Sequence, residues 1–163
     1  MSFFEDVLEA LERADVRYLV VGGLAVVLHG HVRTTLDLDL IIDLRPEQAR
    51  KAIAVLSGLG LEPSVPVDIH EFADPEARER FVRDKHMVAF PLRDPGDVTR
   101  RVDLFVREPR PFDELDKRAL TVPFGRTVAR VIGRQDLVEL KREAARPQDL
   151  ADIAALEAAD DED

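Results

Sequence analysis

Two aspartates, Asp37 and Asp39, lie inside the apolar segment at residues 36–42. Aspartate is depleted in strands, and a carboxylate among apolar neighbours is costly unless something compensates its charge. Because alternate residues of a strand point to the same side, the two carboxylates would share one face. This pattern indicates a shared cation, and a solvated strand edge or a salt-bridged pair is the alternative.

Magnesium is the cation that best suits such a face. It takes oxygen ligands and commonly binds one or two carboxylates together with waters and substrate phosphate oxygens. A third carboxylate, Asp103, lies in the segment RVDLFV and is again flanked by apolar residues. Two metal ions on these three acids would stabilise the attacking and leaving oxygens of a phosphoryl displacement. The alternative for Asp103 is an exposed strand face on which it pairs with Arg101 or Arg107.

A pair of glycines, Gly22 and Gly23, follows the apolar run that begins at Tyr18. Glycine lets backbone amides approach a phosphate closely, and a helix N-terminus adds free N–H groups. We therefore expect a triphosphate at this turn, with its magnesium on the acidic strand. A simple packing turn is the alternative. Arg33 precedes the acidic strand and would reach a phosphate or the substrate, although an exposed surface arginine is the more common outcome.

Length, charge and composition limit the class of protein. The chain has 163 residues, no cysteine and a net charge of −10, which predicts one domain at residues 1–159 and an acidic tail at residues 160–163. An acidic domain is a poor general binder of nucleic acid. The first residues lack the features of a secretory signal, and the longest apolar stretch, residues 18–28, is too short to span a bilayer. We expect a cytoplasmic protein with no membrane partner.

Hydrophobic periodicity and turn residues predict a mixed α/β (α+β) fold. The expected helices are residues 3–14, a short helix from Gly22 to near Gly30, and residues 46–57, 75–83, 134–145 and 147–159. The expected strands are residues 17–21, 34–43, 86–92, 100–106, 119–122 and 126–132. This order indicates a mixed sheet flanked by helices, with a helical cap at the C-terminus.

The order Gly22-Gly23, Asp37-x-Asp39 and an apolar-flanked Asp103 resembles the nucleotidyltransferase superfamily, which has the fold of DNA polymerase β. More closely, the segments GGLAVVLHGHVRTTLDLDL and DLVELKREAARPQDLADIAAL resemble the AbiEii-type nucleotidyltransferases of bacterial abortive-infection and toxin–antitoxin systems. The resemblance covers residues 17–157. It implies that the two glycines contact a triphosphate and that Asp37 and Asp39 bind the catalytic metals, Mg²⁺ or Mn²⁺. It also implies that Asp103 completes the metal site and helps to activate the attacking hydroxyl.

Two residues near the C-terminus also match positions of that family. Lys141 resembles a family lysine that neutralises nucleotide phosphates, and Asp149 resembles a downstream aspartate that would orient this lysine without binding metal. The alternative for Lys141 is a lysine whose aliphatic stem covers the edge of the core. The alternative for Asp149, as for Asp152, is an acid in the first turn of a helix, where it interacts favourably with the helix dipole.

The implied reaction is a magnesium-dependent transfer of a nucleoside monophosphate from an NTP to an acceptor hydroxyl, with release of pyrophosphate. The acceptor would be RNA, a protein or a small molecule. The resemblance further implies a toxin–antitoxin or phage-defence system with a cognate toxin or antitoxin. Two alternatives stay open: a non-catalytic nucleotide-binding antitoxin or sensor, and a magnesium-dependent phosphatase or nuclease. The glycine pair ahead of the acids favours a bound triphosphate over the last of these.

Overall fold

The computed structural model describes residues 2–161. The strands are β1 (Tyr18–Val21), β2 (Asp37–Ile42), β3 (Glu62–Pro63), β4 (Ala89–Asp94), β5 (Asp97–Phe105), β6 (Leu120–Phe124) and β7 (Thr127–Val131). The helices are α1 (Ser2–Arg13), α2 (Gly22–Leu28), α3 (Pro46–Gly58), the 3₁₀ helix η1 (Ile69–Ala73), α4 (Pro75–Lys85), α5 (Phe112–Arg118), α6 (Arg134–Ala144) and α7 (Pro147–Asp161). The acidic tail predicted at residues 160–163 lies partly outside the described residues.

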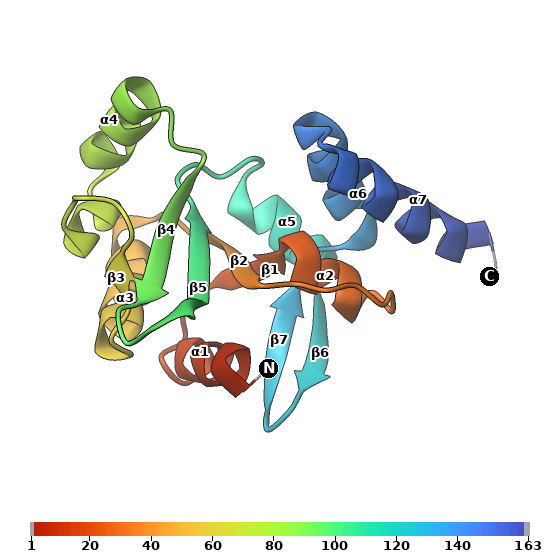
Figure 1. The fold of residues 1–163 in the computed structure, drawn as a ribbon, viewed down its shortest axis with the longest axis horizontal. Coiled ribbons are helices and arrows are strands. Elements are labelled where there is room, and N and C mark those ends of the chain that lie inside the picture. The colour runs from red at the N-terminus through yellow and green to blue at the C-terminus, as the bar shows by residue number, and fades with distance from the viewer. Residues whose placement is uncertain (1, 162–163) are drawn as a thin grey trace.

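The strands form one mixed sheet in the order β3-β4-β5-β2-β1-β7-β6 (Figure 1). The two central strands, β1 and β2, are antiparallel neighbours joined through α2. Parallel pairing then attaches β5 to β2 and β7 to β1. Antiparallel hairpins extend the sheet on both sides, with β4 beside β5 and β6 beside β7. The predicted mixed sheet flanked by helices is confirmed, and it places β2 in the interior of the sheet.

Alternation along β2 separates core residues from candidate site residues. Leu38 and Leu40 are fully buried, whereas Asp37 and Asp39 keep partial exposure on the opposite face. This is the period of two that a strand imposes on its side chains. The apolar side of β2 therefore anchors the strand in the core while the other side is left for chemistry.

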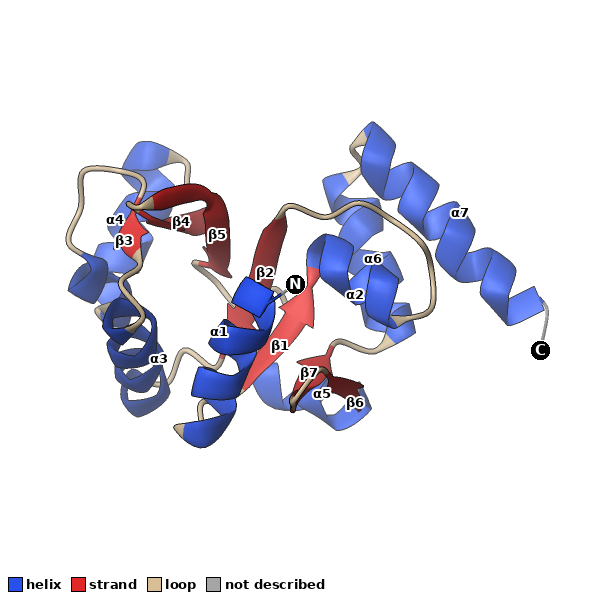
Figure 2. Cartoon of the chain, turned by 60° about the horizontal axis from the view of Figure 1, so that its bottom comes forward, coloured by secondary structure: helices blue, strands red, loops and turns tan. Residues whose placement is uncertain are grey.

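Helices α1 and α3 pack against each other on one side of the sheet (Figure 2). In α1 the residues at helical spacing, Phe4, Val7, Leu8 and Leu11, are buried, as expected for an amphipathic helix. Arg126, in the turn between β6 and β7, holds the outer face of α1 by donating from Nε to Glu9 Oε2 at 2.6 Å. These contacts hold α1 against the core and against the turn between β6 and β7.

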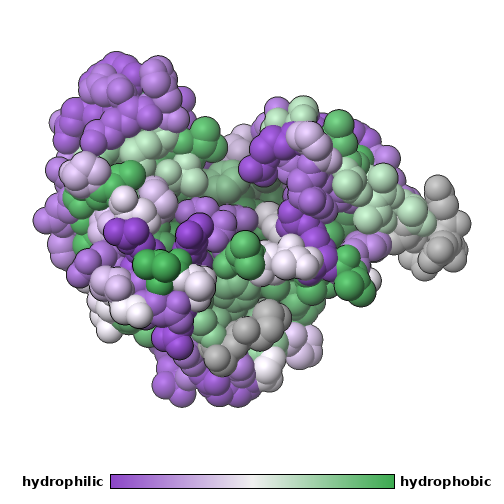
Figure 3. All heavy atoms as spheres, in the orientation of Figure 1, coloured by the Kyte–Doolittle hydropathy of each residue, from purple (hydrophilic) through white to green (hydrophobic). Residues whose placement is uncertain are grey.

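Two groups of helices stand apart at the other side of the molecule. Helix α4 lies at one end and the α6–α7 pair at the other (Figure 1). The space-filling view shows a hollow between these two lobes (Figure 3). No helix within residues 2–161 is both long and apolar enough to cross a bilayer.

Several elements differ from the sequence-based prediction. Strand β2 begins at Asp37, not at residue 34, so the residues before it form a loop that leads directly into the acidic pair. The sequence pattern predicts neither β3 nor η1 nor α5. Helix α5 has seven residues and buries only Phe112 and Leu115, so it is too short to show a clear helical period.

Candidate active site

The pairing of β2 with β5 brings the predicted acids together. The parallel register sets Asp39 directly beside Asp103 and Asp37 beside Arg101. On its other side Asp39 pairs with Val21, the last residue of β1. All three carboxylates therefore lie on one face at the middle of the sheet, next to the turn that follows β1.

Burial and mutual repulsion make this face unfavourable for negative charge. The pKa of Asp39 is raised to about 7, chiefly by burial and then by the charges of Asp103 and Asp37. Positive charge on Lys141 and Arg146 opposes that rise, so both cations lie within electrostatic range of Asp39. Burial, and then the charge of Asp37, also raises the pKa of Asp103. A cation placed among these carboxylates would relieve the repulsion.

The three carboxylates have no direct partner in the part of the chain that the structure describes. Within the described residues no side chain forms a hydrogen bond or ion pair with any of them, and Asp37 Oδ1 is buried without a hydrogen-bond partner. Neither Arg101 nor Arg107 forms an ion pair with Asp103, although the positive charge of Arg101 lowers the pKa of this carboxyl. Arg107 instead contacts Glu79 at 2.7 Å, and Arg101 Nε donates to a backbone carbonyl of its own strand at 3.0 Å.

The glycine turn closes one side of the acidic face. Gly22 has a φ of +65°, and a Cβ atom there would lie 2.0 Å from Asp39 Oδ2. A Cβ atom at Gly23 would lie 1.8 Å from Arg33 Nη1. Helix α2 starts at this turn, and no N-cap side chain hydrogen-bonds to its first amides. Because neither glycine has a side chain, the backbone of the turn can lie against the Asp39 carboxylate at Gly22 and against the Arg33 guanidinium at Gly23.

Lys141 is buried in the α6–α7 corner, with 5% of its surface exposed. Its Nζ lies 2.9 Å from Asp152 Oδ2 and 3.5 Å from Asp149 Oδ1. A lysine that only covers the core edge is therefore ruled out, because its amine is held by two buried carboxylates. Asp149 also accepts hydrogen bonds from the backbone N and the Nε of Arg146, at 3.1 and 2.8 Å, which holds the pKa of this carboxyl below its usual value despite burial.

Two members of this corner are not among the site residues predicted from the sequence. Asp152 is buried and pairs with Lys141 and with Arg33, whose Nε lies 3.2 Å from Asp152 Oδ1. Arg146 approaches Asp39 closely enough to affect its pKa. Asp149 and Asp152, in the segment DLAD, are three residues apart on a helix and therefore lie on one face. This spacing is the sequence signal that links Asp152 to the predicted position of Asp149.

The residues on the acidic face fit a hard divalent cation. Their donors are carboxylate oxygens, one of which is buried and unpaired, and magnesium binds such oxygens together with waters and phosphate oxygens. No group of three or more His, Asp or Glu side chains in residues 2–161 is already arranged as a metal site. The metal-binding role of Asp37, Asp39 and Asp103 therefore stays a prediction.

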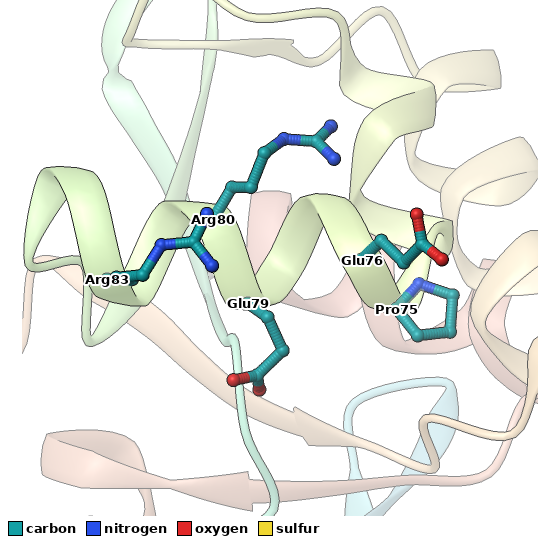
Figure 4. Close-up of a pocket in the computed structure, with 5 residues that line it drawn as sticks. All are labelled: Pro75, Glu76, Glu79, Arg80 and Arg83. Carbon is teal, nitrogen blue, oxygen red and sulfur yellow. The ribbon is translucent and has the colours of Figure 1, made fainter.

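A surface hollow of about 420 Å³ lies elsewhere, against α4 (Figure 4). It is lined by Pro75, Glu76, Glu79, Arg80 and Arg83. Two of these residues pair outside the hollow, Glu79 with Arg107 and Arg83 with Asp84. The close-up shows the charged side chains spread along an exposed helix and not converging on a point. This hollow lacks the unpaired, buried groups of the acidic face, so we do not assign chemistry to it.

Comparisons with known proteins place the chain in a family. The profile of the family described as aminoglycoside-2''-adenylyltransferase matches residues 4–91, more than half of the chain. No curated protein sequence matches it. The matched family supports the predicted nucleotidyltransferase superfamily, but it is not the AbiEii-type family that the sequence segments suggested.

Solved structures share the fold at low identity. ANT(2'')-Ia in complex with adenylyl-2''-tobramycin aligns with a TM-score of 0.63 and 12% identity, over 97% of this chain and 87% of its own. The lincosamide antibiotic adenylyltransferase LnuA, lincomycin-bound, gives 0.64 and 16%, over 96% of both chains. An antigenic nucleotidyltransferase-like protein from Paracoccidioides brasiliensis gives 0.58 and 17%, over 94% and 74%. With this fold and a family match over more than half of its length, the chain belongs to the aminoglycoside-2''-adenylyltransferase family and is a nucleotidyltransferase.

Proposed function

We propose that this chain, acting as one domain over residues 1–159, transfers a nucleoside monophosphate from a magnesium-bound NTP to a hydroxyl of a small molecule. The observation that carries the proposal is the register of β2 and β5, which sets Asp39 beside Asp103 with Asp37 on the same face. Family membership supports a small-molecule acceptor, since ANT(2'')-Ia and LnuA are described with an antibiotic or its adenylylated product bound.

The roles follow from the positions of the side chains. Asp37 and Asp39 would hold Mg²⁺ or Mn²⁺, which when bound neutralises negative charge on the triphosphate and on the oxygens at the reacting phosphorus. Asp103 would accept the proton of the acceptor hydroxyl, and its raised pKa suits a general base. The acceptor oxygen forms a bond to the α-phosphorus, the bond to the bridging oxygen breaks, and pyrophosphate leaves with the electron pair.

The turn and the C-terminal corner would hold the triphosphate. The uncapped amides at Gly22 and Gly23 would donate to phosphate oxygens. Arg33 lies against Gly23, and the positive charge of Lys141 acts on Asp39, so both cations would neutralise negative charge near this turn. Such positioning and charge neutralisation supply most of the catalysis in phosphoryl-type transfer.

The alternatives to a small-molecule acceptor are RNA and protein. Either of these would fit a role with a cognate toxin or antitoxin. The net charge of −10 disfavours a general RNA-binding surface. A single assay separates the acceptors: each α-labelled NTP is incubated with Mg²⁺ or Mn²⁺ and with aminoglycosides, lincosamides, tRNA or cell-extract protein. Label on a small molecule supports the proposal, and label confined to RNA or protein contradicts the acceptor class.

Site variants test the chemistry in the same assay. Asp103→Asn should lower the transfer rate by about 10²–10⁴-fold, the usual contribution of a general base. The matched control is Asp97→Asn on the same strand, whose carboxylate accepts hydrogen bonds from Thr99 and pairs with Arg100. Equal activity of the two variants would refute the role of Asp103. Nucleotide binding without transfer to any acceptor would favour a nucleotide sensor.

A further inference from the structure

We propose that Asp152 is a positioning residue that holds two phosphate-binding cations, Arg33 and Lys141, at the triphosphate site. The inference rests on the proposed function, because it assigns a task to the cations of that same site. Asp152 itself would contact neither the nucleotide nor the metal. It would act through the side chains that it orients.

The two oxygens of Asp152 are divided between two cations from distant parts of the chain. Oδ2 lies 2.9 Å from Lys141 Nζ, and Oδ1 lies 3.2 Å from Arg33 Nε. Gln148 Nε2 also donates to Oδ1 at 3.1 Å. The carboxylate thus joins α7 to α6 and to the loop between α2 and β2.

Arg33 reaches from this carboxylate to the predicted phosphate turn. The guanidinium of Arg33 occupies the space where a Gly23 side chain would lie. Lys141 is held by the other oxygen of the same carboxylate. The Asp152 carboxylate is therefore the common anchor of Lys141 and of the arginine that lies against the glycine turn.

The contact with Arg33 leaves that side chain able to bind a further anion. Its Nε approaches Asp152 as an ion pair but has no aligned hydrogen-bond partner among the described residues. A guanidinium has five N–H donors, so binding to one carboxylate oxygen leaves donors for a phosphate. Since Asp152 is almost fully buried whereas Arg33 is partly exposed, the carboxylate fixes the base of the arginine and its outer end stays accessible.

Another buried carboxylate of the same helical region shows what a purely structural pair looks like. Asp136 at the start of α6 binds one arginine, Arg118, through both oxygens at 2.8 and 3.0 Å. Asp136 is buried to a similar degree as Asp152. It contacts neither Arg33 nor Lys141, so it is a matched control for the loss of a buried charge.

The test measures binding of the four common NTPs with Mg²⁺ by calorimetry, and thermal unfolding of the same samples. Asp152→Asn should raise the dissociation constant of the preferred NTP about tenfold, whereas Asp136→Asn should lower the unfolding temperature and leave NTP affinity unchanged. A double-mutant cycle with Arg33→Met should be non-additive, because Arg33→Met should weaken binding much less once Asp152 is lost.

The outcomes separate the two proposals. Tight NTP binding that is equal in wild type and Asp152→Asn, or additive effects in the cycle, overturns the positioning role and leaves the proposed function intact. Absence of NTP binding by the wild type overturns the proposed function and this inference with it. If Asp152→Asn does not fold, Asp152→Glu keeps the charge but moves the carboxylate by one methylene. It should fold and still bind NTP more weakly, and unchanged affinity would refute the inference.

Discussion

Replacing Asp39 by asparagine should stabilise the metal-free protein at alkaline pH while abolishing transfer. The pKa of Asp39 is about 7 in the folded chain, against 3.8 for an ordinary aspartate. Between these values the unfolded chain binds fewer protons than the folded chain, so this group lowers stability as pH rises. Linkage over the interval from pH 5 to pH 8 gives a loss of roughly 2.5 kcal/mol, as an upper bound that neglects relaxation of the site.

Urea unfolding in EDTA, followed by circular dichroism at pH 5, 6, 7 and 8, measures this loss directly. The free energy of unfolding of Asp39→Asn minus that of the wild type should grow with pH, because asparagine stays neutral throughout. Asp97→Asn is the control: the pKa of Asp97 is held below its usual value by hydrogen bonds from Thr99, so its difference from wild type should not grow over this range. If the difference in free energy of unfolding between Asp39→Asn and the wild type stays constant or narrows from pH 5 to pH 8, the electrostatic argument is refuted.

Three further predictions concern the surroundings of this residue. Adding Mg²⁺ at pH 8 should raise the unfolding temperature of the wild type and leave Asp39→Asn unmoved, and equal shifts in differential scanning fluorimetry would argue against a metal at the acidic face. Lys141→Met should lower the free energy of unfolding by about 3–5 kcal/mol, because it leaves buried carboxylates without their cation. A change below about 1 kcal/mol in a urea titration would contradict this expectation. Gly22→Ala should cost at least ~1 kcal/mol for its positive φ and should also abolish transfer, because its Cβ would displace the Asp39 carboxylate. Gly30→Ala, at a φ of +102° with no atom within 4 Å of the added Cβ, should share the strain but retain transfer activity.

The acidic face could be predicted from the sequence because it depends on local rules. Alternation in β2 alone places Asp37 and Asp39 on one side, and the apolar flanks of Asp103 mark a second interior strand. Their juxtaposition further depends on the parallel register of two strands separated by more than fifty residues, which the sequence pattern suggests but cannot establish. The glycine turn likewise follows from local sequence.

The C-terminal corner could not be predicted to the same depth. Lys141 and Asp149 were found by resemblance, but their burial depends on how α6 packs on α7, which no local pattern records. Asp152 carries no signal of its contact with Arg33, because the two residues come from opposite ends of the chain. The shift in the Asp39 pKa also arises from this assembly, since it combines burial with charges from three separate elements.

The division of β2 into two faces ties the chemistry of the protein to its ability to fold. Inserting or deleting a single residue in this strand would turn Leu38 and Leu40 towards the reaction site and drive both carboxylates into the core. Such a chain would not fold, so insertions and deletions of one residue in this strand should be removed by selection. Point substitutions of Asp37 or Asp39 face no such barrier, because they leave the apolar face untouched. Inactive members of this family should therefore keep the length of the strand and lose only its acids.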